Sequence, residues 1–121
     1  MIAWLRRVEG VTSLEFAFVL GPLLLLLMGT VEVGEVVWTQ NVLNYSVEEA
    51  ARCGAIDTTI CGTPGQIQAY ASSAAGSGIS ATYVASTQSC GSDVAANYTA
   101  AISAPFLNFS IPLSAHACYP K

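Results

Sequence analysis

The longest feature of the chain is a continuous apolar segment near its beginning. No charged residue occurs between Phe16 and Val31, and the centre of this segment is a run of leucines at positions 23–27. An α-helix rises about 1.5 Å per residue, so roughly 20 apolar residues cross a hydrocarbon core of about 30 Å. Residues 11–31 therefore predict a transmembrane helix.

A helical pattern continues beyond this segment to about residue 54. Apolar or small residues recur along it at the spacing of one helical face. They are Val36, Leu43, Val47, Ala50 and Gly54. We expect this face to pack against the rest of the domain, with a partner subunit as the alternative.

A second, shorter helix is predicted over residues 64–75. Thr63 and Gln66 have the spacing of a capping box, in which each side chain accepts from the other residue's backbone N–H. Pro64 suits the first helical position because proline has no N–H to leave unpaired there. The Gly-Ser-Gly sequence at 76–78 marks the end of this helix.

The rest of the chain alternates between apolar and polar side chains, as half-buried strands do. The predicted strands cover residues 79–86, a segment from about 98 to Ala104-Pro105, and residues 109–118. Pro112 suits an edge strand because it donates no backbone hydrogen bond. The expected fold class is α+β: a long N-terminal transmembrane helix continues into a small disulfide-bonded domain with a second helix and a three-stranded antiparallel sheet.

All four cysteines follow the apolar segment. They are Cys53, Cys61, Cys90 and Cys118. An even count beyond a membrane segment predicts two disulfides in an oxidising compartment. The local pairing joins the first two and the last two cysteines, although three connectivities are possible. No C-x2-C spacing of a zinc site is present, so no metal is expected.

Charge is sparse and unevenly distributed. Charged residues make up 10% of the chain, against about 25% in an ordinary soluble domain. Arg6 and Arg7 precede the apolar segment, and Glu32 follows it, so the N-terminus is expected in the cytoplasm. Trp38 is a candidate anchor at the outer membrane interface, or else a packing residue. The distal part has too few basic residues to bind nucleic acid.

No set of side chains predicts catalysis. His116 is the only histidine, and nothing around it marks a nucleophile with a base and an orienting acid. Glu48 and Glu49 are neighbours, so they point to different sides of a helix. We therefore expect no enzyme activity and no cofactor.

Three features distinguish the apolar helix from a plain anchor or a cleaved secretory signal. The small-residue cleavage site of a signal peptide is missing after the apolar segment. Glu15 places a carboxylate near the start of the span, where ionisable residues are costly and usually functional. Pro22 removes a helix hydrogen bond and is expected to kink or loosen the helix.

Residues 6–16 resemble the cleavage region of type IV prepilins. Arg6 and Arg7 stand in a short leader that ends in Gly10, the next residue is the apolar Val11, and Glu15 is the fifth residue from there. The resemblance implies that a prepilin peptidase cuts after Gly10 and exposes the amino group of Val11, which is often methylated in such proteins. It also implies that Glu15 faces the N-terminal amine of a neighbouring subunit, with snorkelling to the interface as the alternative.

The following segments are similar to TadE-like pseudopilins, minor subunits of tight-adherence (Tad, Flp) pili. The similarity covers roughly residues 6–56 and includes the segments 15–22, 29–34 and 47–52. It departs from the family at Glu35, where a basic residue is expected. The implied function is a structural minor pilin that takes part in pilus assembly or initiation; the alternative is a membrane-tethered or pilus-tip adhesin.

The same resemblance implies the organisation and location of the chain. Residues 1–10 would be a leader, 11–31 the transmembrane and assembly helix, and 32–121 an extracytoplasmic pilin-like domain. The protein would be a single-pass protein of a bacterial inner membrane, with its C-terminal domain in the periplasm or within a surface pilus. Its expected partners are prepilin peptidase, other pilin and pseudopilin subunits, the inner-membrane assembly machinery and membrane lipid.

Overall fold

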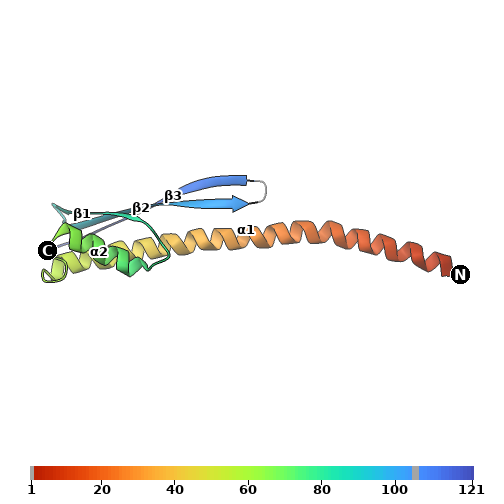
Figure 1. Ribbon diagram of the computed structural model, residues 1–121, viewed down its shortest axis with the longest axis horizontal. Helices are drawn as coiled ribbons and strands as arrows, with labels where there is room; N and C mark the ends of the chain where they lie inside the picture. Colours follow the sequence, from red (N-terminus) through yellow and green to blue (C-terminus); the bar gives the residue numbers. More distant parts are fainter. Residues whose placement is uncertain (1, 105–106) are drawn as a thin grey trace. The chain divides into compact units, whose positions relative to one another are not determined.

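The computed structural model describes residues 2–104 and 107–121, with side chains from 11 to 103 and from 107 onward. Pro105, expected to close the second strand, lies outside the described residues. The elements are α1 (Ile2–Ile56), α2 (Pro64–Ala75), β1 (Thr82–Gln88), β2 (Gly91–Ala104) and β3 (Leu107–Tyr119) (Figure 1). They form two compact units, one ending at Glu35 and one from Val36 to Lys121. The α+β fold predicted from the sequence is thereby confirmed.

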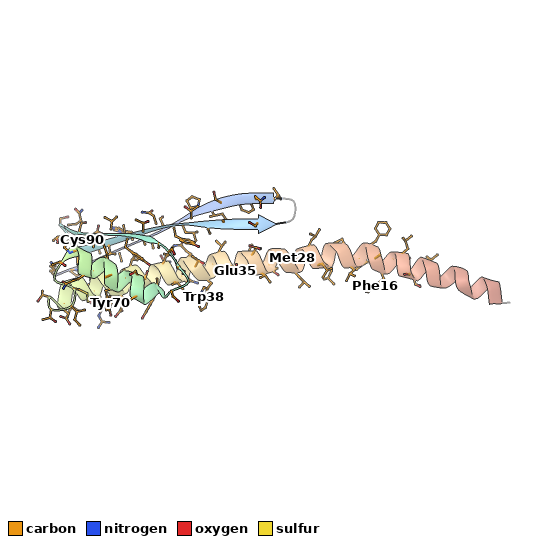
Figure 2. All side chains as sticks on the ribbon, viewed as in Figure 1. Phe16, Met28, Glu35, Trp38, Tyr70 and Cys90 are labelled. Carbon is orange, nitrogen blue, oxygen red and sulfur yellow. A yellow bond between two sulfur atoms is a disulfide. The ribbon has the colours of Figure 1, made fainter. Side chains whose placement is uncertain are left out.

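The first unit is a helix, and from Val11 onward its large apolar side chains are exposed. α1 continues through Pro22 without ending. Phe18 is 73% exposed and Leu26 is 63% exposed, and Figure 2 shows Phe16 and Met28 projecting from the ribbon. Among the described residues, Val11–Ile56 contains the one candidate membrane span, by length and composition.

The second unit is built on the apolar face of α1. Leu43, Val47 and Ala50 are fully or almost fully buried, and they share one core with Ile67 and Ala71 of α2 and with the sheet. The prediction that this face packs within the domain is therefore confirmed.

The loop between the two helices is organised by Asp57. The backbone N–H groups of Thr59 and Ile60 donate to Asp57 Oδ1 at 2.9 and 3.2 Å, and the Thr59 hydroxyl donates to the same atom. The Thr59 side-chain bond is the main cause that lowers the pKa of Asp57 below its usual value, and the two backbone bonds add to it. A disulfide from Cys53 to Cys61 closes the same loop.

The start of α2 has the predicted capping box. Gln66 N–H donates to Thr63 Oγ1 at 3.4 Å, and Thr63 N–H donates to Gln66 Oε1 at 3.0 Å. Pro64 occupies the first turn, and Gly76 follows the helix at a φ of 81°. Local chemistry alone therefore sets both ends of this helix.

The three strands pair in the order β1-β2-β3, antiparallel throughout. One face of the sheet is turned toward the core. On this face, residues of neighbouring strands lie directly opposite one another. These pairs are Tyr83 with Ala96, Ala85 with Val94, Val94 with Ala117, Ala96 with Ala115, and Tyr98 with Leu113. A two-residue turn links Gln88 to Gly91, whose φ of 129° favours glycine.

The observed strand bounds differ most from the prediction at the starts of β1 and β2. β1 begins at Thr82 instead of residue 79, because its pairing with β2 begins at Asn97 opposite Thr82. β2 begins at Gly91, well before Tyr98. Its first half contains Ala95 and Ala96, two similar residues that point to opposite faces, so hydropathy does not alternate there.

Hydrogen bonds from α1 fix the sheet against the helix. Ser46 Oγ lies 3.0 Å from the Tyr83 hydroxyl, in the buried core. Gln40 Nε2 donates to the backbone carbonyl of Ser114 at 2.9 Å. One bond reaches β1 and the other reaches β3, so the register of the helix against the sheet is specified at two points.

The closest approach of the two layers depends on Gly54. A Cβ atom there would lie 2.4 Å from Ser92 Oγ and 2.7 Å from Ile67 Cδ1. Ser92 is buried, and its hydroxyl has no hydrogen-bond partner in the described part of the chain. We expect Gly54→Ala to lower stability by about 1–3 kcal/mol through overpacking, measured by thermal unfolding in detergent.

The control for this prediction is Gly65→Ala, because nothing lies within 4 Å of a Cβ at Gly65. Ser92→Ala in the Gly54→Ala background should recover part of the loss, since it removes the closest atom. Equal melting temperatures for Gly54→Ala and Gly65→Ala would contradict the close approach.

The Asp57 loop should weaken in acid. The pKa of Asp57 is lower in the folded chain than its ordinary value. The Asp57 carboxylate therefore stabilises the fold fully above the ordinary carboxyl pKa, and this stabilisation is lost as the pH falls through the pKa of the folded state. Amide chemical shifts of Thr59 and Ile60, followed by NMR, should titrate together below the usual pKa. Asp57→Asn should remove that titration, whereas a midpoint at or above the usual value would refute the prediction.

Candidate functional site

The candidate assembly site is a short segment of α1 around Glu15. Glu15 is the only charged residue between Gly10 and Val31, and its side chain is exposed among exposed apolar neighbours. Leu14 is 61% exposed and Phe16 is 66% exposed. Among the side chains that the structure describes, none covers the Glu15 carboxylate, which is exposed.

The backbone of α1 places Val11 and Glu15 on one helical face. Residues four apart in an α-helix lie one above the other, separated by about 6 Å along the axis. The backbone of Gly10 is helical, because α1 begins at Ile2 and runs through this residue. The spacing thus puts the candidate cleavage point one turn from the carboxylate.

The other end of the apolar segment carries different chemistry. Glu32 is partly buried and Glu35 is exposed. Trp38 is 71% exposed, so it does not pack in the core of the second unit. Of the two roles expected for Trp38, this exposure favours the interfacial one.

The four cysteines form the two disulfides expected from the local pairing. Cys53 is joined to Cys61 and Cys90 to Cys118, with Cα–Cα distances of 5.7 and 6.2 Å. The first closes the end of α1 onto the loop that leads to α2. The second joins the β1–β2 turn to the end of β3, so each disulfide ties chain segments that also meet in the fold.

A small polar cluster lies on the outer face of the sheet. Asp93 Oδ1 is 2.5 Å from His116 Nε2, and Ser86 Oγ donates to Asp93 Oδ2 at 3.4 Å. The Asp93 carboxylate also lies close to the sulfurs of Cys90 and Cys118. Those sulfurs are bonded to each other and supply no thiolates, so this cluster is a contact between Asp93 and His116 beside a disulfide.

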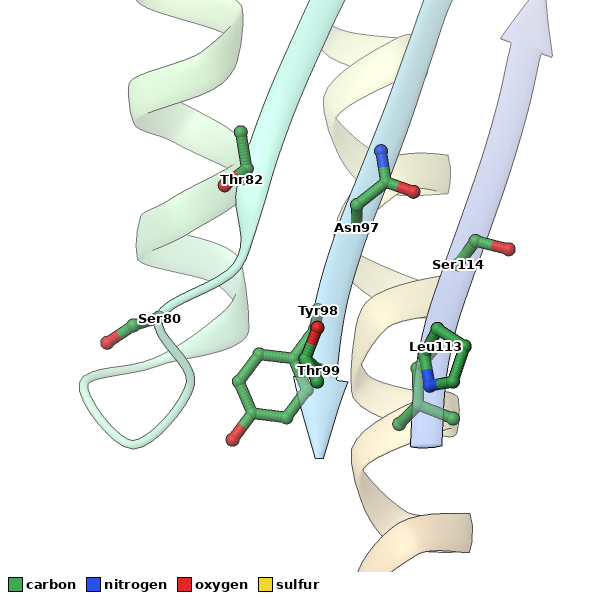
Figure 3. Close-up of a pocket in the computed structure, with 8 residues that line it drawn as sticks. Ser80, Thr82, Asn97, Tyr98, Thr99, Leu113 and Ser114 are labelled. Carbon is green, nitrogen blue, oxygen red and sulfur yellow. The ribbon is translucent and has the colours of Figure 1, made fainter. Parts of the chain in front are cut away.

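The same face of the sheet has a shallow hollow where β1 begins. Its volume is about 620 Å³. It is lined by Ser80, Thr82, Asn97, Tyr98, Thr99, Pro112, Leu113 and Ser114 (Figure 3). Hydroxyl and amide groups dominate this lining and no charged residue belongs to it, so it suits a neutral polar ligand better than an ion.

Sequence reasoning missed the Asp93–His116 pair and the hollow. Both are formed by residues on different strands, and they depend on a register that begins at Gly91. The only sequence signal was the alternation of polar residues along the strands, which does not reveal which strands are neighbours.

Comparison with known proteins identifies the helical part of the chain. The family model described as TadE-like protein matches residues 10–52. No curated protein and no solved structure matches the chain significantly. The matched segment begins at Gly10, includes Glu15 and ends one residue before Cys53. Residues 10–52 are accordingly similar to the TadE-like family, which is consistent with a TadE-like pilin of the Tad pilus system.

Proposed function

We propose that this chain is a structural minor pilin, or pseudopilin, of a Tad-type pilus. The observation that carries the proposal is the TadE-like match over residues 10–52. The helix there exposes apolar side chains, and its span 11–31 holds a single carboxylate, that of Glu15. The TadE-like family is structural and not enzymatic, which supports a role in assembly. The second unit would then be the part presented outside the membrane.

The proposed mechanism begins with cleavage after Gly10. Val11 would then be the first residue of the helix and would carry the new amino group. At a helix N-terminus, the unpaired N–H groups and the helix dipole favour a nearby negative charge. Glu15 lies one turn away and supplies that charge. Cleavage thus creates a positive group next to a carboxylate in an otherwise apolar segment.

Assembly would pair Glu15 with the Val11 amine of a neighbouring subunit. An ammonium and a carboxylate attract strongly in low dielectric, and each is costly when buried alone. The pairing would therefore set the axial register between two apolar spans that carry no other charged residue. If the Glu15 side chain instead reaches the cytoplasmic interface, it does not fix the axial register between two helices.

The proposed location is a bacterial inner membrane with the N-terminus in the cytoplasm. The single apolar helix supports single-pass anchoring, and Arg6 and Arg7 on one side with Glu32 on the other support the orientation. Prepilin peptidase, other pilin subunits and the inner-membrane assembly machinery would be its partners.

The alternative function is a membrane-tethered or pilus-tip adhesin. The uncharged hollow beside β1 is the observation that favours it. An adhesin needs α1 only as a tether, so changes at Gly10 and Glu15 would leave surface binding intact. The following two experiments therefore separate the two functions.

Cleavage is tested at the N-terminus of the membrane-extracted protein. Sequencing by Edman degradation or mass spectrometry should begin at Val11 in cells that contain prepilin peptidase. Cells without the peptidase should yield the chain with residues 1–10 attached. A chain that keeps these residues in the presence of the peptidase would exclude processing after Gly10.

Glu15→Gln should leave membrane insertion unchanged and lower recruitment into pili. Leaving a buried ammonium unpaired costs about 3–5 kcal/mol, so we expect at least about a tenfold loss of chain in sheared pili. Immunogold labelling and counting of pili provide the measurement. Glu32→Gln is the matched control, and equal recruitment of the two variants would argue for the tether.

A further inference from the structure

The two longest strands extend beyond the rest of the sheet. β1 pairs with β2 only up to Asn97, whereas β2 and β3 remain paired as far as Ala104. Figure 1 shows these two strands continuing past β1. We call residues 98–104 of β2 and 107–111 of β3 the extended hairpin. In the described part of the chain, no third strand lies beside it.

The core-facing side of β3 loses its cover along the extended hairpin. Alternate residues of a strand share one face of the sheet. On this face Leu113 is 8% exposed, Phe109 is 49% exposed and Leu107 is 65% exposed. The opposite face at the same level has the exposed polar side chains of Asn108 and Ser110. The face that packs in the core of the unit thus continues as an exposed apolar surface.

The extended hairpin points toward the end of the second unit at which Val36 lies. Gln40 Nε2 donates to the carbonyl of Ser114 at 2.9 Å. Farther along both elements, Tyr119 of β3 lines a cavity together with Arg52 of α1. β3 therefore runs along α1 in the direction of the helix, and its residues before Ser114 lie toward Val36. This is the end of the unit that α1 joins to the apolar segment.

The extended hairpin is longer than the stretch of helix that leads from Gln40 to the apolar segment. Leu107 is seven residues before Ser114, which corresponds to about 24 Å at roughly 3.4 Å per residue. Gln40 is nine residues after Val31, the last residue of the predicted span, and this is about 14 Å of α-helix. The difference is at most about 10 Å, and apolar faces enter the boundary between headgroups and acyl chains by about 5–10 Å.

The chemistry of the extended hairpin suits the surface of a bilayer. No Asp, Glu, Lys or Arg occurs between Asp93 and Lys121, so contact with lipid takes no such charge out of water. The unpaired backbone groups at its edges exclude it from the hydrocarbon core, but they remain hydrated among the headgroups. Asn108 and Ser110, on the polar face, have side chains that can hydrogen-bond to headgroups.

We propose that the extended hairpin is a lipid-binding element, whose Leu107 and Phe109 side chains enter the interface of the membrane that α1 crosses. The bilayer surface is the occupant because α1 holds it within reach of the hairpin and because the hairpin offers it an apolar, uncharged face. The second unit then has two attachments to the membrane, which restrict its rotation about the helix. This inference rests on membrane anchoring by α1, as in the proposed function, and not on cleavage after Gly10.

Fluorescence quenching tests the proposal in phosphatidylcholine nanodiscs that each hold one full chain. The described cysteines are all in disulfides, so Leu107→Cys adds a single thiol for a fluorescent label. The quencher is a nitroxide on the lipid acyl chain close to the headgroup. Ile60→Cys is the matched control, because Ile60 is 57% exposed and lies in the loop after α1 ends. We expect the Leu107 label to be quenched at least about threefold more than the Ile60 label.

A label at Leu24→Cys, within the apolar segment, reports anchoring separately. Quenching of this label by a nitroxide deep in the acyl chain, with equal quenching of the Leu107 and Ile60 labels, would overturn the inference and leave the anchoring intact. An unquenched Leu24 label would overturn the anchoring together with the inference. If the Leu107 label leaves water only in discs that hold two chains, a second copy covers the surface and the lipid contact is refuted.

Charge substitution separates apolar insertion from electrostatic attraction to lipid. Phe109→Asp should lower quenching of the Leu107 label to the level of the control, because a carboxylate resists transfer into the membrane. Ile60→Asp should leave that quenching unchanged, as should replacement of part of the phosphatidylcholine by phosphatidylglycerol. Equal melting temperatures in detergent would show that both variants fold. Quenching that is indifferent to a charge at position 109, or that requires phosphatidylglycerol, would contradict the proposal.

Discussion

The fold of the second unit depends on the close contact between α1 and the inner face of the sheet. Leu43, Val47 and Ala50 supply the apolar surface, and Gly54 lets the helix pass over Ser92 and Ile67 without a side chain between them. Small residues dominate the facing strands, including Ala96, so the two layers approach closely. Shallow packing of this kind is sensitive to single added methyl groups.

The same helix has two different environments along its length. Its first part exposes apolar side chains around its whole circumference, which suits hydrocarbon surroundings, while its last turns bury one face and expose the other. The change occurs near Val36, where the second unit begins. A single helix therefore joins a segment whose apolar side chains are exposed to one whose apolar face is buried in its own domain.

Much of the fold followed from local sequence patterns. The apolar segment, the buried face of α1, the capping box at Thr63 and the cysteine pairing were all predicted because each depends on residues near one another in sequence or on simple periodicity. The start of β2 was missed because Ala95 and Ala96 give no alternation. The Asp93–His116 pair and the unequal strand lengths were missed because they depend on register, which only tertiary pairing defines.

The second disulfide has a mechanical consequence. Cys90 and Cys118 are 28 residues apart in sequence, and the segment between them contains nearly all of β2 and β3. If tension pulls on the two ends of the chain, the covalent bond carries the load past this segment. About 95 Å of extended backbone is thereby withheld from stretching, at roughly 3.4 Å per residue. The hydrogen bonds between β2 and β3 can then break and re-form under load while the two strands remain joined as a closed loop.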